Sequence, residues 1–341
     1  MAAQRPRDIL LVRNGDSPLA RQACDRARGI FHAGGYNAVF LDAPSATELS
    51  EALTDTVRSR AAHVAAVVAV GGDGMAHLVL QVLHEVGQQG VDVAFGLIPA
   101  GSGNDLARFC GIPTRDTERA AGRVLRGLET PSQHMDLLAV DCADGSSHVC
   151  ATTVCLGLDA RVNARANRWT QIRVPAKYAV ALVWEIMRLT SRDYTIDYTR
   201  PDGARRVADR RATFLSVANT SSYGGGLTIV PRADHRDGRA ELFAVSDARP
   251  LRLLFLLPRL LLKTHENLAE IALEPVTSVT VVPHGTSSGP TVAHGTVTRS
   301  TSDPETRTEK LPPHVAHGDG EPLGPLPVRV RILPAAVRVL F

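Results

Sequence analysis

The chain has 341 residues, of which 44% are hydrophobic and 21% charged, and its formal net charge is +3. This length accommodates two domains, and the composition excludes a chain that is disordered throughout. The small net charge gives no argument for nucleic acid as a partner. The five cysteines, none of them spaced as CxxC, favour neither a disulfide framework nor a zinc site, and they indicate a reducing compartment.

No apolar stretch approaches the roughly 20 residues that a membrane-spanning helix needs. The richest stretch, LRLLFLLPRLLL at 251–262, is short and is interrupted by two arginines and a proline. The N-terminal residues lack the apolar core of a signal peptide. We therefore expect a cytoplasmic protein whose membrane contact is at most peripheral, at the inner face of the cell membrane.

Apolar runs and helical stretches alternate over the first 100 residues. The expected strands are 8–13, 37–43, 63–70 and 91–99, and the expected helices are 17–33, 46–60 and 75–88. The third run, HVAAVVAV, is apolar throughout, as in a parallel sheet that is covered on both faces. This alternation predicts a doubly wound α/β nucleotide-binding domain over residues 1–130.

Beyond residue 130 the pattern changes to short alternating segments. We expect strands at 194–199, 205–219, 240–245, 276–282 and 328–334, a turn at Asp144-Gly145 and one helix at 174–190. The second half, 131–332, is therefore predicted to be a mostly β domain. Residues 283–313 are rich in Thr, Ser, Gly, Pro and His, and we expect a flexible loop there.

The stretch AVGGDGMAHL follows the third expected strand. Gly71, Gly72 and Gly74 would let backbone N–H groups converge on an oxygen anion, and the positive end of the next helix would add to them. Asp73, among these donors, could face Mg²⁺ or its waters. The same residues would also make an ordinary βα turn with an aspartate as helix cap.

A second glycine-rich loop, PAGSGNDLAR at 99–108, follows the next strand. It has the same arrangement of a strand, a glycine-rich turn and a helix. Gly101 and the hydroxyl of Ser102 lie in the turn, and Asn104 and Asp105 begin the helix. Alone, it could be a loop that one of these two residues caps. Parallel α/β sheets bind ligands beyond the carboxyl ends of their strands, so the two loops together predict a nucleoside-phosphate site.

A pair of acids stands late in the chain, in HGDGEPLG at 317–324. Asp319 and Glu321 flank one glycine, and in isolation this pattern is most often a solvated turn. Two acids at this spacing could also divide their roles, with one as general base and the other as its orienter or as a metal contact.

In combination, GGDG, PAGSGNDLAR and the late DGE resemble the diacylglycerol kinase catalytic family. The resemblance covers most of the chain. It implies an α/β N-terminal domain, a C-terminal antiparallel β-sandwich domain, ATP in the cleft between them, and a last segment, 333–341, that rejoins the first domain. It further implies ATP and Mg²⁺ as cofactors and transfer of the γ-phosphoryl group to a lipid hydroxyl, first of all from diacylglycerol to phosphatidic acid.

The family's site residues carry over onto matching positions. The implied catalytic residues are Asp319, as the acid that takes the proton, and Glu321. The implied nucleotide-binding residues are Asn14, Gly15, Asp16, Ser17, Gly71, Gly72, Asp73, Gly74, Met75, Gly101, Ser102, Asn104 and Asp105. Two of these positions depart from the family: Met75 stands where a threonine is usual, and RNGDS at 13–17 replaces an Asn-Pro loop.

The stretch PRADHRDGRAEL at 231–242 also resembles a family motif. There Asp237, with carbonyls near Asp234 and Arg239, would hold a structural Mg²⁺; the other interpretation is an ordinary turn. The apolar faces of 174–190 and 251–263 could line a lipid-tail cavity or rest on a membrane, or they could be core packing.

Rival functions stay open at this point. A sphingoid base or another lipid alcohol could be the acceptor, and a nucleotide-binding regulatory protein with weak or lost catalysis is the second rival. NAD kinases share a GGDG loop, but PAGSGNDLAR argues against them. The expected partner is a lipid presented at a membrane surface, with no nucleic acid, and a homodimer is left open.

Overall fold

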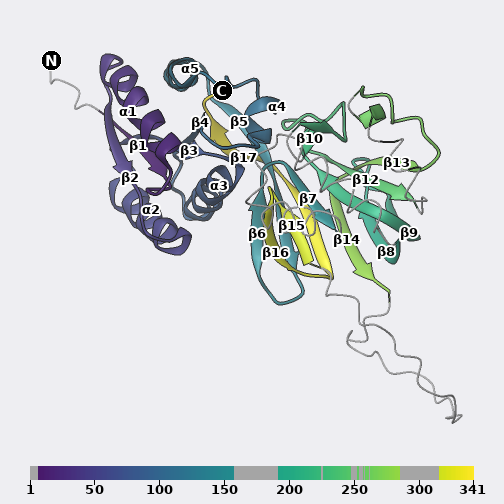
Figure 1. Ribbon diagram of the computed structural model, residues 1–341. Helices are drawn as coiled ribbons and strands as arrows, with labels where there is room; N and C mark the ends of the chain where they lie inside the picture. The colour runs from purple at the N-terminus through teal and green to yellow at the C-terminus, as the bar shows by residue number, and fades with distance from the viewer. Residues whose placement is uncertain are drawn as a thin grey trace, which may run out of the picture.

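The computed structural model describes residues 7–156, 191–223, 226–246, 252, 256, 258–260, 262–284 and 315–341. The expected helix at 174–190, parts of the 251–263 stretch and nearly all of the 283–313 loop lie outside the described residues. The α/β half and the antiparallel half lie next to each other, and strands at their junction connect them (Figure 1).

The first half is a parallel sheet with helices on both faces. Its strands, in the order β2-β1-β3-β4, are β2 (Asn37–Leu41), β1 (Asp8–Arg13), β3 (Val64–Gly71) and β4 (Ala94–Pro99). Its helices are α1 (Pro18–Ala33), α2 (Ala46–Arg60), α3 (Asp73–Gln88), α4 (Asp105–Phe109) and α5 (Thr117–Glu129). Helix α1 packs against α5, and α2 packs against α3 on the opposite face (Figure 1). The doubly wound prediction is confirmed.

Local chemistry explains where the helices begin. Ser17 Oγ accepts the N–H of Ala20 at 3.2 Å and caps α1, and Ser45 caps α2 in the same way. Helix α3 begins at Asp73, two residues earlier than expected, because the Gly72 carbonyl already accepts the N–H groups of Met75 and Ala76. Asp73 therefore lies in the first turn of the helix.

The second half is built of antiparallel strands. They are β5 (Gln133–Cys142), β6 (Ser147–Cys150), β7 (Thr153–Leu156), β8 (Arg192–Thr199), β9 (Arg205–Ala218), β10 (Ser222–Tyr223), β11 (Leu227–Thr228), β12 (Ala240–Ser246), β13 (Ile271–Val276), β14 (Ser278–Pro283), β15 (Val315–Gly318), β16 (Glu321–Pro325) and β17 (Val328–Val339). Two apolar cores lie on opposite faces of β9, since Leu215 belongs to one core and its neighbour Phe214 to the other. The prediction of an antiparallel β domain is confirmed.

The expected strand 276–282 is in fact parts of two strands. Strand β13 pairs with β12, whereas β14 pairs with β8 and β17, and the chain changes neighbours at Thr277. Pro275 has no N–H to donate. Among the described strands β13 pairs with β12 alone, so it lies at an edge of the sheet, where a proline is tolerated. A single apolar run could not show that its two ends belong to different strand pairs.

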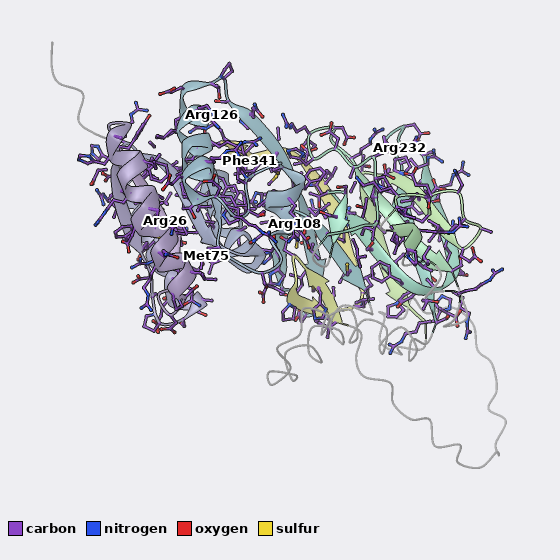
Figure 2. The ribbon with its side chains drawn as sticks, turned by 45° about the horizontal axis from the view of Figure 1, so that its top comes forward. Arg26, Met75, Arg108, Arg126, Arg232 and Phe341 are labelled. Carbon is purple, nitrogen blue, oxygen red and sulfur yellow. The ribbon has the colours of Figure 1, made fainter. Side chains whose placement is uncertain are left out.

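Strand β17 joins the two halves. It pairs with β14 and β5 in the second half, and Val339 lies opposite Phe95 of β4 in the first half. The chain bends at Ala335, where φ is 49°, and runs beyond the expected end at residue 334. Leu340 donates its N–H to Phe95, and the ring of Phe341 meets that of Phe95 edge-on at 6.2 Å, at the place labelled in Figure 2.

Within the described residues, no helix has the length and apolar character needed to cross a bilayer.

Candidate active site

The two glycine loops are in direct contact at the carboxyl ends of β3 and β4. Ala100 donates its N–H to the Gly71 carbonyl at 2.8 Å. A Cβ on Gly101 would collide with the Cα of Gly72 and would lie 2.9 Å from its nitrogen. Glycine is therefore required here by the close approach of two backbones, not only by a turn.

Asn104 closes the second loop on itself. Its Nδ2 donates to the Gly101 carbonyl at 2.7 Å, and its Oδ1 accepts the Gly101 N–H at 3.2 Å. The residue has a φ of 54°, in the left-handed region that asparagine tolerates better than most side chains. The side chain is buried, so these hydrogen bonds are shielded from water.

Asp73 links the first loop to the helix that follows the second. Its Oδ2 accepts the N–H of Asp105 at 3.1 Å, and its Oδ1 accepts that of Leu106 at 3.2 Å. Burial raises the pKa of Asp73, the two amides oppose the rise, and the charges of Asp105 and Asp319 add to it. The expected metal-facing carboxylate thus caps α4, and two further carboxylates act on it electrostatically.

The other expected nucleotide residues stand at the same edge of the sheet. In the loop after β1, Asn14 Oδ1 accepts the N–H of Asp16 at 2.8 Å, and Ser17 caps α1. Gly15 lies beside Asp42. Ser102 is exposed, and the half-buried side chain of Met75 packs on the core of the first half. Met75 and Arg108, both labelled in Figure 2, lie in α3 and α4, the helices that follow β3 and β4.

Asp319 lies in the turn between β15 and β16, where its φ is 53°. Its carboxylate is buried and accepts four hydrogen bonds. Oδ2 accepts the N–H of Ala151 at 2.8 Å, and Oδ1 accepts the N–H and the hydroxyl of Thr152 at 2.8 and 2.5 Å. The fourth donor is His77 Nδ1, at 3.1 Å from Oδ2. Helix α3 of the first half therefore contacts the turn of Asp319, Gly320 and Glu321 in the second half, which we call the acid turn.

His77 is a site residue that the sequence analysis missed. It stands four residues after Asp73 on α3, so the two side chains share one face of the helix. This spacing behind a glycine loop is the signal that could have found it. Burial lowers the pKa of His77, but the hydrogen bond and charge of Asp319, with a contribution from Glu321, raise it above its ordinary value.

The same contact shifts the pKa of Asp319 in the opposite direction. Burial alone would raise the pKa of Asp319, but the hydrogen bond and charge of His77 lower it, as do Thr152 and the Ala151 amide. The pKa of Asp319 is therefore held below its ordinary value, and the carboxylate is ionised at neutral pH.

Glu321 brings the acid turn onto the first glycine loop. Its side chain is exposed, and a Cβ on Gly74 would lie only 2.7 Å from Glu321 Oε1. The two glycine loops and the two acids of DGE, expected from separate stretches of sequence, thus meet in one place.

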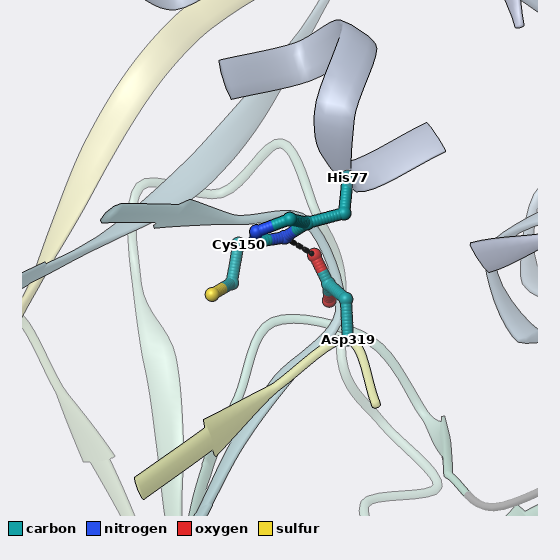
Figure 3. Close-up of side chains that lie close together, drawn as sticks. All are labelled: His77, Cys150 and Asp319. Atoms are coloured by element: carbon teal, nitrogen blue, oxygen red, sulfur yellow. Dashed lines mark hydrogen bonds and ion pairs between the residues drawn. The ribbon is translucent and has the colours of Figure 1, made fainter. Parts of the chain in front are cut away.

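Cys150 lies beside this pair, and the donor atoms of His77, Cys150 and Asp319 fall within 4.8 Å of one another (Figure 3). A Cβ on Gly318 would collide with the Cys150 sulfur, which shows that the sulfur packs on that backbone. Burial raises the pKa of Cys150 well above its ordinary value, so it is a thiol. With both oxygens of Asp319 already accepting hydrogen bonds, the trio does not fit a metal ion.

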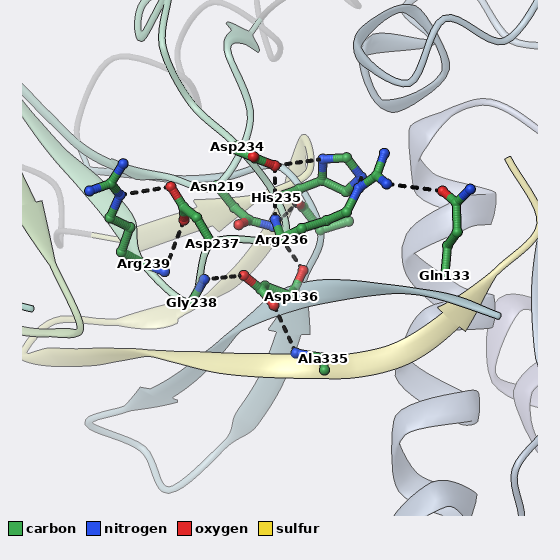
Figure 4. A network of polar contacts seen from close by, with 11 residues as sticks. Gln133, Asp136, Asn219, Asp234, His235, Arg236, Asp237, Gly238, Arg239 and Ala335 are labelled. Carbon is green, nitrogen blue, oxygen red and sulfur yellow. Dashed lines mark hydrogen bonds and ion pairs between the residues drawn. The ribbon is translucent and has the colours of Figure 1, made fainter. Parts of the chain in front are cut away.

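A buried network behind the acid turn was also missed. Asn219 Nδ2 donates to the carbonyls of Ala151 and Asp136, at 2.9 and 2.8 Å. The Asp136 carboxylate accepts the N–H groups of Gly238 at 2.8 Å and Ala335 at 2.7 Å (Figure 4). The network positions the segment whose amides hold Asp319, and it joins that segment to the bend of β17.

The expected magnesium stretch lies next to this network. Asp237 accepts the N–H of Arg239 at 3.1 Å and its Nε at 2.7 Å, and Asp234 accepts the N–H of Arg236 (Figure 4). The Arg239 guanidinium balances the charge of Asp237 in this arrangement. The magnesium assignment stays a prediction.

Comparison with known proteins now identifies the family. Residues 8–137 match the diacylglycerol kinase catalytic domain, and residues 152–298 match the YegS C-terminal NAD kinase beta sandwich-like domain. A diacylglycerol kinase of Mycobacterium tuberculosis is 33% identical over 277 residues, which cover 81% of this chain and 76% of that protein. The chain belongs to the diacylglycerol kinase family. Relatives of the chain are named as diacylglycerol kinases and lipid kinases, and the chain is a lipid kinase.

Two further proteins are similar to this chain. A protein of Stenotrophomonas maltophilia named "Probable lipid kinase YegS-like" is 32% identical over 174 residues, half of this chain and 53% of its own length. A crystal structure of a diacylglycerol kinase from Bacillus anthracis matches with a TM-score of 0.65 at 15% identity, over 99% of this chain and 98% of that one. This last likeness shows the fold, with the expected α/β domain and β-sandwich.

Proposed function

We propose that this lipid kinase uses ATP, bound as its Mg²⁺ complex, to phosphorylate the free hydroxyl of diacylglycerol, which yields phosphatidic acid. The observation that carries the proposal is the meeting of three turns. Gly101 lies on Gly72, and the acid turn reaches the first loop through Glu321 at Gly74 and through Asp319 at His77. Backbone donors and carboxylates from both halves thus meet in one place.

The start of α3 supports binding of the nucleotide phosphates. Met75 and Ala76 donate to the Gly72 carbonyl, and the preceding N–H groups, on Asp73 and Gly74, have no acceptor among the described residues. Two free N–H groups at the positive end of a 16-residue helix form a phosphate site that needs no lysine.

The buried acids support a nucleotide that arrives with its cation. Asp105 and Asp319 are buried, Asp73 is half-buried, and the charges of the first two raise the pKa of Asp73. A bare triphosphate would add further negative charge beside these acids. The Mg²⁺ complex relieves the repulsion, so removal of Mg²⁺ with a chelator is expected to abolish transfer.

The chemistry then needs little from the protein beyond position and charge. The lipid hydroxyl oxygen attacks the γ-phosphorus, and the bond from this phosphorus to the β–γ bridging oxygen breaks. ADP leaves with the electron pair, and the hydroxyl proton passes to the enzyme at the His77–Asp319 pair. Diacylglycerol is the acceptor that the name of the Mycobacterium tuberculosis relative supports, and we propose that it is presented at the inner face of the membrane.

The direct test is transfer from γ-labelled ATP to a panel of lipids in mixed micelles. The wild type is compared with Asp319→Asn and with Asp144→Asn, an exposed acid in the β5–β6 turn. We expect labelled phosphatidic acid, a loss of about 10²- to 10⁴-fold in Asp319→Asn, and no loss in the control. Labelling of a sphingoid base or another lipid alcohol instead would replace the acceptor. ATP binding without transfer to any lipid would favour the regulatory protein.

A further inference from the structure

The Asp319 carboxylate has no free position from which to take a proton. Each oxygen already accepts two hydrogen bonds, from Ala151 and His77 on Oδ2 and from the amide and hydroxyl of Thr152 on Oδ1. Four donors stabilise the ionised form, so protonation would break at least one of these bonds. The side chain is 3% exposed. These contacts suit a carboxylate that orients another group.

His77 has the opposite character. Its side chain is 13% exposed, more than that of Asp319, and its Nε2 has no hydrogen-bond partner within the described part of the chain. Figure 3 shows the ring between α3 and the acid turn, with Nδ1 directed at Asp319. The ring is therefore held at one nitrogen and open at the other.

The contact also determines the tautomer of the ring. An ionised carboxylate can only accept, so Nδ1 must carry the hydrogen in the bond to Asp319. In the neutral ring the lone pair then lies on Nε2, as in any histidine whose Nδ1–H a carboxylate orients. Asp319 thus leaves the basic lone pair on Nε2, the nitrogen that has no hydrogen-bond partner in the described part of the chain.

We propose that His77 Nε2, oriented by Asp319, is the group that takes the proton from the attacking hydroxyl. The inference rests on the proposed function and assigns its proton transfer. As the hydroxyl oxygen bonds to the γ-phosphorus, its proton passes to Nε2 and ADP leaves with the electrons of the broken bond. The imidazolium is stabilised by the Asp319 charge and returns its proton to water after the products leave.

The charges that face the ring set the direction of the pH dependence. Asp319 and Glu321, both from the acid turn, are the charged groups that act on it, and they outweigh burial and raise the pKa of His77 above 6.5. Cys150, from β6, is neutral because burial raises its pKa. The base must be unprotonated, so activity rises with pH through a value above 6.5. An Asp319 base, with a lowered pKa, would stay active far below that range.

The test is the pH dependence of kcat/KM for lipid phosphorylation, from pH 5 to 9, in wild type and His77→Asn. Asparagine can still donate to Asp319 but cannot accept the proton. We expect a wild-type acid limb above pH 6.5, a loss of about 10²- to 10⁴-fold in His77→Asn at pH 8, and no such limb in the residual activity. His84→Asn, further along α3 and hydrogen-bonded to Gln88, is the matched control and keeps the wild-type profile.

A second variant tests the ring without removing it. Glu321→Gln deletes one of the two charges that raise the pKa of His77. The acid limb of the pH profile of kcat/KM should therefore move to lower pH in this variant. Full wild-type activity at pH 5, or the same limb and nearly the same rate in His77→Asn, would overturn the assignment while leaving the kinase function intact. Absence of lipid phosphorylation in the wild type at every pH would overturn both.

Discussion

The two parts of the site are held by different kinds of contact. The glycine loops are ordered within one parallel sheet, with Gly101 against Gly72 and Asn104 bonded to a residue three positions away. Asp319 instead takes its backbone donors from residues 167 and 168 positions earlier, and its histidine from 242 positions earlier. The nucleotide loops are thus a local product of the sheet, whereas the acid turn depends on the whole tertiary structure. A substitution at the junction of the two halves should therefore destabilise the protein more than a substitution within one glycine loop.

The largest effect is expected from Asp136→Ala at the junction. The change removes a buried carboxylate that accepts part-buried hydrogen bonds from the N–H groups of Gly238 and Ala335, and the loss of each bond costs roughly 1–3 kcal/mol. We expect a loss of about 2–6 kcal/mol in the free energy of unfolding, measured by urea denaturation. Asp144→Ala, in an exposed turn, is the control. A loss below about 1 kcal/mol would contradict the importance of the long-range network.

A smaller effect is expected from Gly101→Ala in the loop. The new Cβ collides with Gly72, and overpacking of this kind costs about 1–3 kcal/mol. Displacement of the two loops should also lower the affinity for the Mg²⁺ complex of ATP, measured by calorimetry. Gly29→Ala in α1 is the matched control, because nothing lies near its added Cβ and a helical alanine is favoured by about 1 kcal/mol. Equal nucleotide binding in both variants would argue against a loop–loop contact.

The smallest effect is expected in the pH dependence of stability. The pKa of His77 is raised on folding, so the charged ring stabilises the fold fully below about 6.5. That contribution is lost as the pH rises through the folded pKa. Asp319 has a lowered pKa, and its contribution is lost only as the pH falls below its ordinary value. The difference in melting temperature between wild type and His77→Asn should therefore shrink above pH 6.5; a constant difference would show that the ring does not titrate.

Much of the fold follows from patterns that short stretches carry. Helix α2 has the predicted bounds, because Ser45 is a strong cap and the periodicity is clear. The run HVAAVVAV identifies a buried parallel strand wherever it stands. The break between β13 and β14 at Thr277 escaped prediction, since the choice of neighbouring strand is made by segments far away in the chain.

By itself, the sequence determined the two halves, the glycine loops on neighbouring strands and the family. Backbone freedom and strand–helix alternation are local properties, so they can be predicted from short stretches of sequence. Only the tertiary structure decided that Asp73 caps α4, that Asn219 and Asp136 support the acid turn, and that His77 bonds to Asp319. The reason is physical: a hydrogen bond depends on which groups lie within about 3 Å, and that distance is set by packing between segments that the sequence separates.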